Sequence, residues 1–117
     1  MHDFRVSVSP HPPFTVVSVI GELDVITEPE LRRNVEMTLE DEPSCRLLFD
    51  LTALRFIDSS GVRVILDCYT RTRDSGGSVT VCGLNPHMQH LFGILGLTVR
   101  VNVYPSLAAA VSHAVGE

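Results

Sequence analysis

Short apolar strand patterns alternate with amphipathic helical patterns along this chain, and this alternation constrains the fold more than any other feature. Apolar residues follow a strand pattern in five segments: 4–8, 14–20, 47–51, 79–82 and 99–103. Helical spacing follows four helix starts, at Thr27, near residue 60, at Asn85 and at Pro105-Ser106. The predicted order is therefore β-β-α-β-α-β-α-β-α, which is typical of an α/β domain.

The first two predicted strands are joined by the five residues 9–13, three of which are prolines. This short, rigid connection predicts an antiparallel hairpin. A helical segment separates every later pair of strands, so those strands are expected to be mostly parallel. Neither linkers nor repeats interrupt the pattern, and residues 1–117 are therefore predicted to form one domain with a mixed sheet.

The first helix carries the most detailed start signal. Thr27 is the predicted N-cap, Pro29 lies in the first turn, and Glu30 completes a capping box. Ile26 and Leu31 have the spacing of the hydrophobic staple that accompanies such a box. The helix that starts at Asn85 is predicted to end at Gly96. One apolar stripe of this helix is predicted to face the core, and it contains Met88, Leu91, Phe92 and Leu95.

Composition excludes several classes of function. The formal charge of −5 argues against nucleic-acid binding, and all nine basic residues are arginines. The lack of lysine rules out a Walker phosphate loop and a Schiff-base enzyme. No run of about 18 apolar residues spans a membrane and no signal-peptide pattern precedes the domain, so a cytoplasmic location is expected.

No cofactor or metal site is predicted. Cys45, Cys68 and Cys82 are odd in number and have apolar neighbours, which predicts buried free thiols. His87 and His90 lie one helical turn apart without further ligands, and they are expected to face solvent.

The most informative polar motif is Asp58-Ser59-Ser60-Gly61, which falls between the strand 47–51 and the helix that follows. The four residues can simply supply the helix N-cap, or one of the serines can accept a phosphate. A phosphate here would meet the free N–H groups and the positive end of the helix. Gly61 fits both readings, because a glycine lets another chain approach closely and keeps the serine exposed.

Two catalytic readings of this region fail on the sequence. A hydrolase nucleophile elbow requires Gly-x-Ser-x-Gly, and residue 57 is isoleucine. A response-regulator receiver, with Asp50 as phospho-acceptor, requires an acidic pair after the first strand and a lysine, and this chain has neither. Asp50 is instead predicted to form a turn before Leu51-Thr52. No enzymatic activity is therefore expected.

With these motifs in this order, the chain resembles the STAS-domain anti-sigma factor antagonists of bacteria. The resemblance rests on four segments: Gly21–Asp24, Asp50–Leu54, Phe56–Val62 and Leu91–Leu97. It implies a mixed sheet with helices packed on one side. It also implies that Ser59 is phosphorylated by a cognate anti-sigma factor that is itself a serine kinase, and that a phosphatase resets the switch.

The same resemblance implies roles for the neighbouring residues. Ser60 would cap the helix, and Asp58 would orient the acceptor or contact the kinase. Arg63 stands where many members have a small residue, and it would contact the partner or the phosphate. The implied partner-binding residues are Asp24, Asp58, Ser60, Gly61 and Arg63. The alternative is a non-enzymatic STAS subunit of a lipid-transport or scaffold complex, in which phosphorylation has no part.

Overall fold

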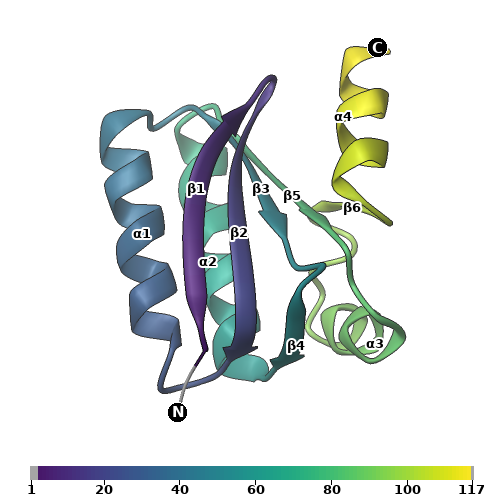
Figure 1. Cartoon of the computed structure of the whole chain (residues 1–117). Helices are drawn as coiled ribbons and strands as arrows, with labels where there is room; N and C mark the ends of the chain where they lie inside the picture. The colour runs from purple at the N-terminus through teal and green to yellow at the C-terminus, as the bar shows by residue number, and fades with distance from the viewer. Residues whose placement is uncertain (1–2, 117) are drawn as a thin grey trace.

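An N-terminal hairpin forms one edge of the sheet in the computed structural model, which describes residues 3–116 (Figure 1). Strand β1 (Arg5–His11) pairs antiparallel with β2 (Phe14–Leu23), as predicted. The turn is shorter than expected, because pairing continues to His11 opposite Phe14 and leaves only the Pro12–Pro13 pair to reverse the chain. Strand β1 is an edge strand, so one side of its backbone forms no hydrogen bonds with a neighbouring strand. Pro10, which lacks a backbone N–H, can therefore be part of it.

The strands that follow the hairpin pair in parallel. Strand β3 (Arg46–Asp50) pairs with β2 and β5 (Ser78–Cys82), and β6 (Asn102–Tyr104) pairs with β5. The order of strands across the sheet is β1-β2-β3-β5-β6. The mixed α/β sheet predicted from the sequence is confirmed. Strand β6 is shorter than the predicted segment 99–103, because Val99 is 83% exposed and precedes the pairing.

A sixth strand, β4 (Leu54–Ile57), is absent from the sequence prediction. It pairs in parallel with the last three residues of β2, after a register shift between Gly21 and Glu22. Gly21 has φ +103°, a conformation that side chains disfavour. Strand β4 buries only its two end residues, so it lacks the period-two pattern by which strands are recognised.

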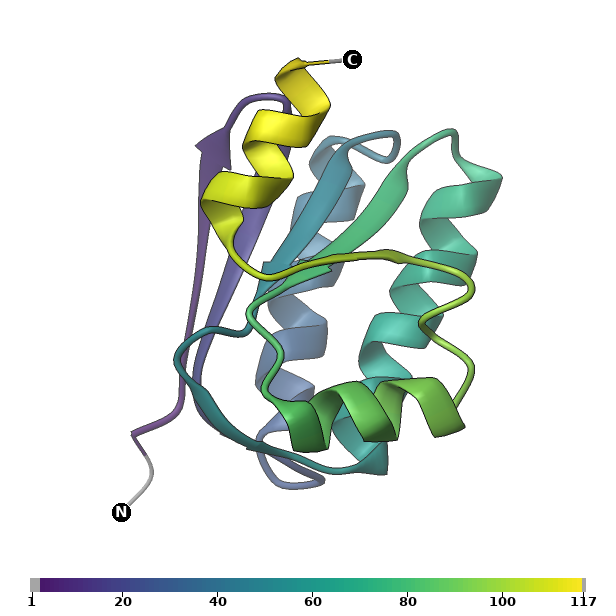
Figure 2. The ribbon, with the colours of Figure 1, turned by 90° about the vertical axis from the view of Figure 1, so that its right-hand side faces the viewer.

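Helices cover both faces of the sheet (Figure 2). Helices α1 (Glu28–Asp41) and α2 (Ser59–Asp74) pack on one face, against a core that includes Val17, Val19 and Phe49. Helix α3 (Pro86–Ile94) adds Met88 and Phe92 to the same core.

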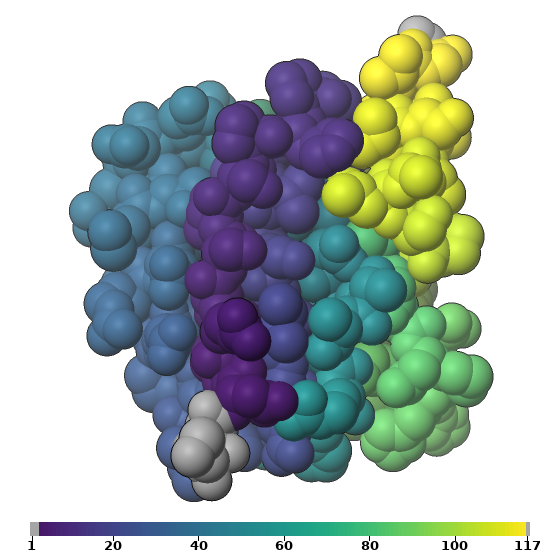
Figure 3. Space-filling model, in the orientation of Figure 1, coloured from purple at the N-terminus to yellow at the C-terminus, as the bar shows by residue number. Residues whose placement is uncertain are grey.

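Helix α4 (Leu107–Val115) packs on the opposite face, where a smaller cluster contains Phe14, Val16, Leu48, Cys82 and Ala110. The resemblance implied helices on one side only, and α4 is the exception. Figure 3 shows β1 running down the front of the molecule between α1 and α4. No helix in residues 3–116 is long and apolar enough to cross a membrane.

The start of α1 differs from its prediction. Thr27 precedes the helix, but its hydroxyl caps no helical N–H; it donates to the Glu22 carbonyl at 2.8 Å and accepts from the Asp24 N–H at 3.0 Å. The capping box is therefore wrong. The staple is also wrong, because Ile26 is 69% exposed and does not pack on Leu31.

Helix α3 begins as predicted, with the Asn85 side chain accepting from the Met88 N–H at 2.8 Å. Met88 and Phe92 are buried, but Leu95 is 39% exposed and is not a core residue. The helix ends at Ile94, and Gly96 turns the chain away with φ +78°. Leu95 therefore leaves the helical stripe that its spacing predicted.

Candidate partner-binding site

The serine motif lies at the junction of β4 and α2, at the lower end of the molecule in Figure 1. Strands β2 and β4 end side by side, with Leu23 opposite Ile57, and the Asp58 N–H donates to the Leu23 carbonyl at 3.2 Å. Because the two strands are parallel, the segments that follow them start from the same edge of the sheet. The pairing thus brings Asp24 and Asp58, which are distant in sequence, to one end of the fold.

Asp58, not a serine, is the N-cap of α2. Its Oδ1 atom accepts hydrogen bonds from the N–H groups of Ser60 at 2.9 Å and Gly61 at 3.2 Å. Its carbonyl accepts the Val62 N–H at 3.1 Å. The prediction that Ser60 caps the helix is wrong, because Ser59 and Ser60 are already the first two helical residues.

Both serine hydroxyls are therefore left out of the helix cap. Within residues 3–116, neither of them has a hydrogen-bond partner. Ser59 is exposed and Ser60 is half-buried. Ser59 is consequently the more accessible of the two to a second protein.

Gly61 is buried between the first turn of α2 and the ends of β2 and β4. A Cβ atom at this position would lie 2.7 Å from Leu23 Cγ and 2.8 Å from Ile57 Cγ1. The close approach that the glycine permits is therefore between α2 and the ends of β2 and β4, whereas the sequence suggested approach by another chain. This contact fixes the height of the first turn of α2 above the sheet, and with it the position of Ser59.

An open hollow of about 430 Å³ lies beside Ser59, and its lining is partly polar and partly apolar. The lining residues are Ser59, Ser60, Val62, Arg63, Leu66 and Leu95. Sequence reasoning missed Leu66 and Leu95. The signal for Leu66 was available, because residues 59, 63 and 66 have i, i+4, i+7 spacing and share one face of a helix.

Asp24 shapes the turn between β2 and α1. Its Oδ1 atom accepts the N–H groups of Ile26 at 2.9 Å and Thr27 at 3.0 Å. This turn leaves the side chains of Val25 and Ile26 66% and 69% exposed. The Gly21–Asp24 segment is thus the end of β2 followed by a turn with an exposed apolar tip.

Arg63 is exposed on α2 and takes part in none of the ion pairs within residues 3–116. Asp67, one turn further along the same face, is engaged elsewhere: its Oδ2 atom lies 3.0 Å from Arg32 Nη1 on α1. Arg63 therefore brings an unpaired positive charge to the hollow.

The comparisons with known proteins agree with this architecture. The family model described as STAS domain matches residues 5–110. The chain belongs to the STAS domain family. The family and the fold predicted from the sequence are thereby confirmed.

Similar proteins are named as anti-sigma factor antagonists. The anti-sigma F factor antagonist of Paenibacillus polymyxa is 27% identical over 111 residues, covering 95% of each chain. The anti-sigma-B factor antagonist of Bacillus subtilis (strain 168) is 30% identical over 87 residues, which cover 74% of this chain and 78% of the relative. The crystal structure of an anti-sigma factor antagonist from Mycobacterium paratuberculosis superposes with a TM-score of 0.84 at 28% identity, covering 95% of this chain and 93% of that one.

Within residues 3–116, the cysteines and the two histidines of α3 do not come together in a second site. Cys45, Cys68 and Cys82 are free and buried, as predicted. Burial raises the pKa of the Cys68 thiol to about 12, so the thiolate needed for nucleophilic attack is scarce at neutral pH. His87 and His90 are exposed, as predicted. No group of three or more potential metal ligands occurs within residues 3–116.

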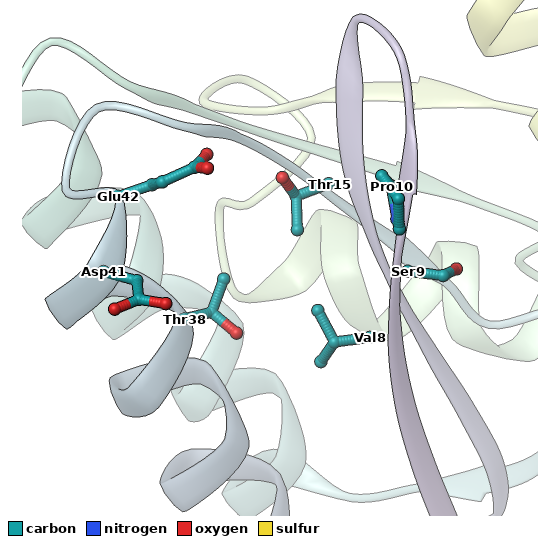
Figure 4. A pocket seen from close by; sticks show the side chains of 7 residues that line it. All are labelled: Val8, Ser9, Pro10, Thr15, Thr38, Asp41 and Glu42. Carbon is teal, nitrogen blue, oxygen red and sulfur yellow. The ribbon is translucent and has the colours of Figure 1, made fainter.

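A second hollow, of about 250 Å³, lies at the other end of the hairpin (Figure 4). Its side chains come from the hairpin and from the end of α1: Val8, Ser9, Pro10, Thr15, Thr38, Asp41 and Glu42. The Thr38 hydroxyl already donates to the Asn34 carbonyl of its own helix at 2.9 Å. This hollow contains no part of the serine motif, so the candidate site of the STAS domain is the Ser59 hollow.

Proposed function

We propose that this STAS domain is an anti-sigma factor antagonist controlled by phosphorylation of Ser59. In its unphosphorylated form it binds a cognate anti-sigma factor, which is a serine kinase, and the bound sigma factor is released. It works in the cytoplasm as a binding protein and not as an enzyme. The observation that carries the proposal is the exposed Ser59 hydroxyl, which has no hydrogen-bond partner in residues 3–116 and directly follows the N-cap. The names of the similar proteins support it.

The partner binds the end of the molecule at which β2 and β4 finish. Gly61 contributes indirectly, by packing the first turn of α2 onto the sheet. Asp58 uses one carboxylate oxygen for the cap, and the other oxygen is available to the partner. The proposed partner-binding residues are Asp24, Asp58, Ser60, Gly61 and Arg63.

Phosphorylation takes place inside this complex. The γ-phosphoryl group of ATP is transferred to Ser59 Oγ, so an Oγ–P bond forms and the bond from the γ-phosphorus to the ADP oxygen breaks. The hydroxyl proton passes to a base of the kinase, and ADP leaves. A phosphatase later hydrolyses the phosphoserine with water, which restores the hydroxyl and releases inorganic phosphate.

The phosphate ends the interaction because it adds a charge of roughly −1.5 to −2 at the centre of the contact. Burying such a charge against a surface complementary to a neutral hydroxyl costs desolvation energy and like-charge repulsion. A loss of about 3 kcal/mol in binding free energy is enough to weaken the complex about 100-fold.

Incubation with the cognate kinase and ATP, followed by mass spectrometry, tests the proposal. We expect one phosphate, on Ser59, in the wild type and in Ser60→Ala, and none in Ser59→Ala. In a pull-down, Ser59→Asp should lose the partner, whereas Ser75→Asp, which adds the same charge at the other end of α2, should keep it. Equal binding by wild type, Ser59→Ala and Ser59→Asp would contradict the switch and favour the non-switching subunit of a lipid-transport or scaffold complex.

A further inference from the structure

We propose that Arg63 is the intramolecular counter-ion of a phosphate on Ser59. The inference rests on the proposed function in one respect, the identity of the modified residue. Ser59 and Arg63 are four residues apart on α2, a spacing that places side chains on the same face about 5–6 Å apart at Cβ. Both line the same hollow of about 430 Å³. A phosphate on Ser59 Oγ therefore lies within reach of the guanidinium group.

The backbone offers this phosphate little stabilisation. A helix start normally presents free N–H groups to an anion, but three of them are occupied here. The Asp58 side chain accepts the N–H groups of Ser60 and Gly61, and the Asp58 N–H donates to the Leu23 carbonyl at 3.2 Å. The Asp58 carboxylate also has the same sign of charge as the phosphate. Within residues 3–116, only the N–H of Ser59 remains without an acceptor at this helix start, so the phosphate meets one free N–H group and not the several that were expected. A cationic side chain nearby would add to this limited stabilisation.

Arg63 is the cation available for this role. Asp67, its i+4 neighbour, is already held by Arg32 at 3.0 Å, so forming a new pair with phosphate breaks no ion pair of Arg63. A guanidinium group can donate two parallel hydrogen bonds to phosphate oxygens, which an ammonium group cannot do with the same geometry. In the unphosphorylated protein, the same guanidinium is free to contact the partner.

This pairing increases the effect of a single modification. Phosphorylation introduces a dianion and at the same time engages the positive charge that the partner met before. The surface beside α2 changes from one unpaired cation to a paired cation with excess negative charge. Arg63 is therefore a positioning residue of the switch, because it holds the phosphate on the α2 surface.

A titration of the phosphate followed by ³¹P NMR tests this inference without a kinase. Phosphoserine is incorporated at position 59 during translation, into the wild type, Arg63→Gln and Arg71→Gln. The last variant removes the same charge from the same helix, twelve residues or about 18 Å from Ser59, beyond the screening length of about 8 Å at physiological salt. We expect the second phosphate pKa, ordinarily about 6, to be about 0.3 to 0.7 units lower in the wild type and in Arg71→Gln than in Arg63→Gln.

Equal phosphate pKa values in all three proteins would overturn the inference, as would an equal rise in both variants, which would indicate a general charge effect. Arg63→Lys should keep most of the shift if charge alone produces it, and should lose part of it if the bidentate geometry contributes. Because the phosphate is installed directly, the result does not depend on a kinase or a partner. Failure to find kinase-dependent phosphorylation would contradict the proposed function and leave this measurement intact.

Discussion

Alanine substitution at two helical glycines should change stability in opposite directions. Gly61 lies in the first turn of α2 and Gly93 near the end of α3, and neither has a positive φ. At an exposed helical position, alanine is favoured over glycine by about 1 kcal/mol. At Gly93 an added Cβ meets no heavy atom within 4 Å, whereas at Gly61 it lies 2.7–2.9 Å from side-chain carbons of Leu23 and Ile57.

The magnitudes follow from how far these neighbours can move. Leu23 and Ile57 are 0% and 1% exposed, so they have no free space into which to retreat. Forcing a methyl group into such a core costs about 1 to 3 kcal/mol, and three contacts below 3 Å indicate the upper part of that range. After the gain in helix propensity is subtracted, Gly61→Ala should lose about 1 to 2 kcal/mol. Gly93→Ala should gain about 0.5 to 1 kcal/mol.

Urea denaturation followed by circular dichroism measures both values, provided that the transitions are two-state. In thermal unfolding, a change of 1 kcal/mol corresponds to a shift of about 3 to 6 °C for a chain of this size. If Gly61→Ala is as stable as Gly93→Ala, the first turn of α2 is not packed as tightly on Leu23 and Ile57 as the structure shows. The argument for the fixed position of Ser59 would then fail with it.

Two further predictions concern the helix cap and a buried thiol. Asp58→Ala should lower the free energy of unfolding by about 1 kcal/mol, because it removes the N-cap. Ser60→Ala should change the free energy of unfolding by less than about 0.5 kcal/mol. The reverse ranking in urea denaturation would contradict the assignment of Asp58 as N-cap. Burial raises the pKa of the Cys68 thiol from 9.0 to about 12. The stability due to this protonated thiol is therefore complete below about pH 9 and falls as the pH rises toward 12, by about 1.4 kcal/mol per pH unit. Cys68→Ala should flatten that slope in alkaline denaturation, and an unchanged slope would refute the buried protonated thiol.

Local signals in the sequence were sufficient for some features of the fold. Asn85 and Ser106 cap their helices through hydrogen bonds to residues three positions ahead, and such short-range contacts leave a recognisable pattern. The existence and position of the serine motif were also readable, since it falls between apolar and amphipathic segments. These features depend on neighbours in sequence only.

Features that depend on distant contacts could not be predicted. Strand β4 exists because it pairs with the end of β2, more than thirty residues earlier. Its pairing decides where the strand stops, and this in turn makes Asp58 the cap instead of Ser60. The burial of Gly61 against Leu23 has the same origin. Several side chains of the serine motif can cap a helix, and the tertiary contacts decide that Asp58 does so.

The central claim is that the phosphorylation state of Ser59 controls partner binding, and the most direct test is the affinity of the cognate anti-sigma factor for two forms of this chain. One form carries the free hydroxyl and the other carries phosphoserine incorporated at position 59, and both are measured by isothermal titration calorimetry. The account predicts that the phosphate weakens binding about 100-fold or more, which is about 3 kcal/mol. Affinities that agree within about threefold would contradict it.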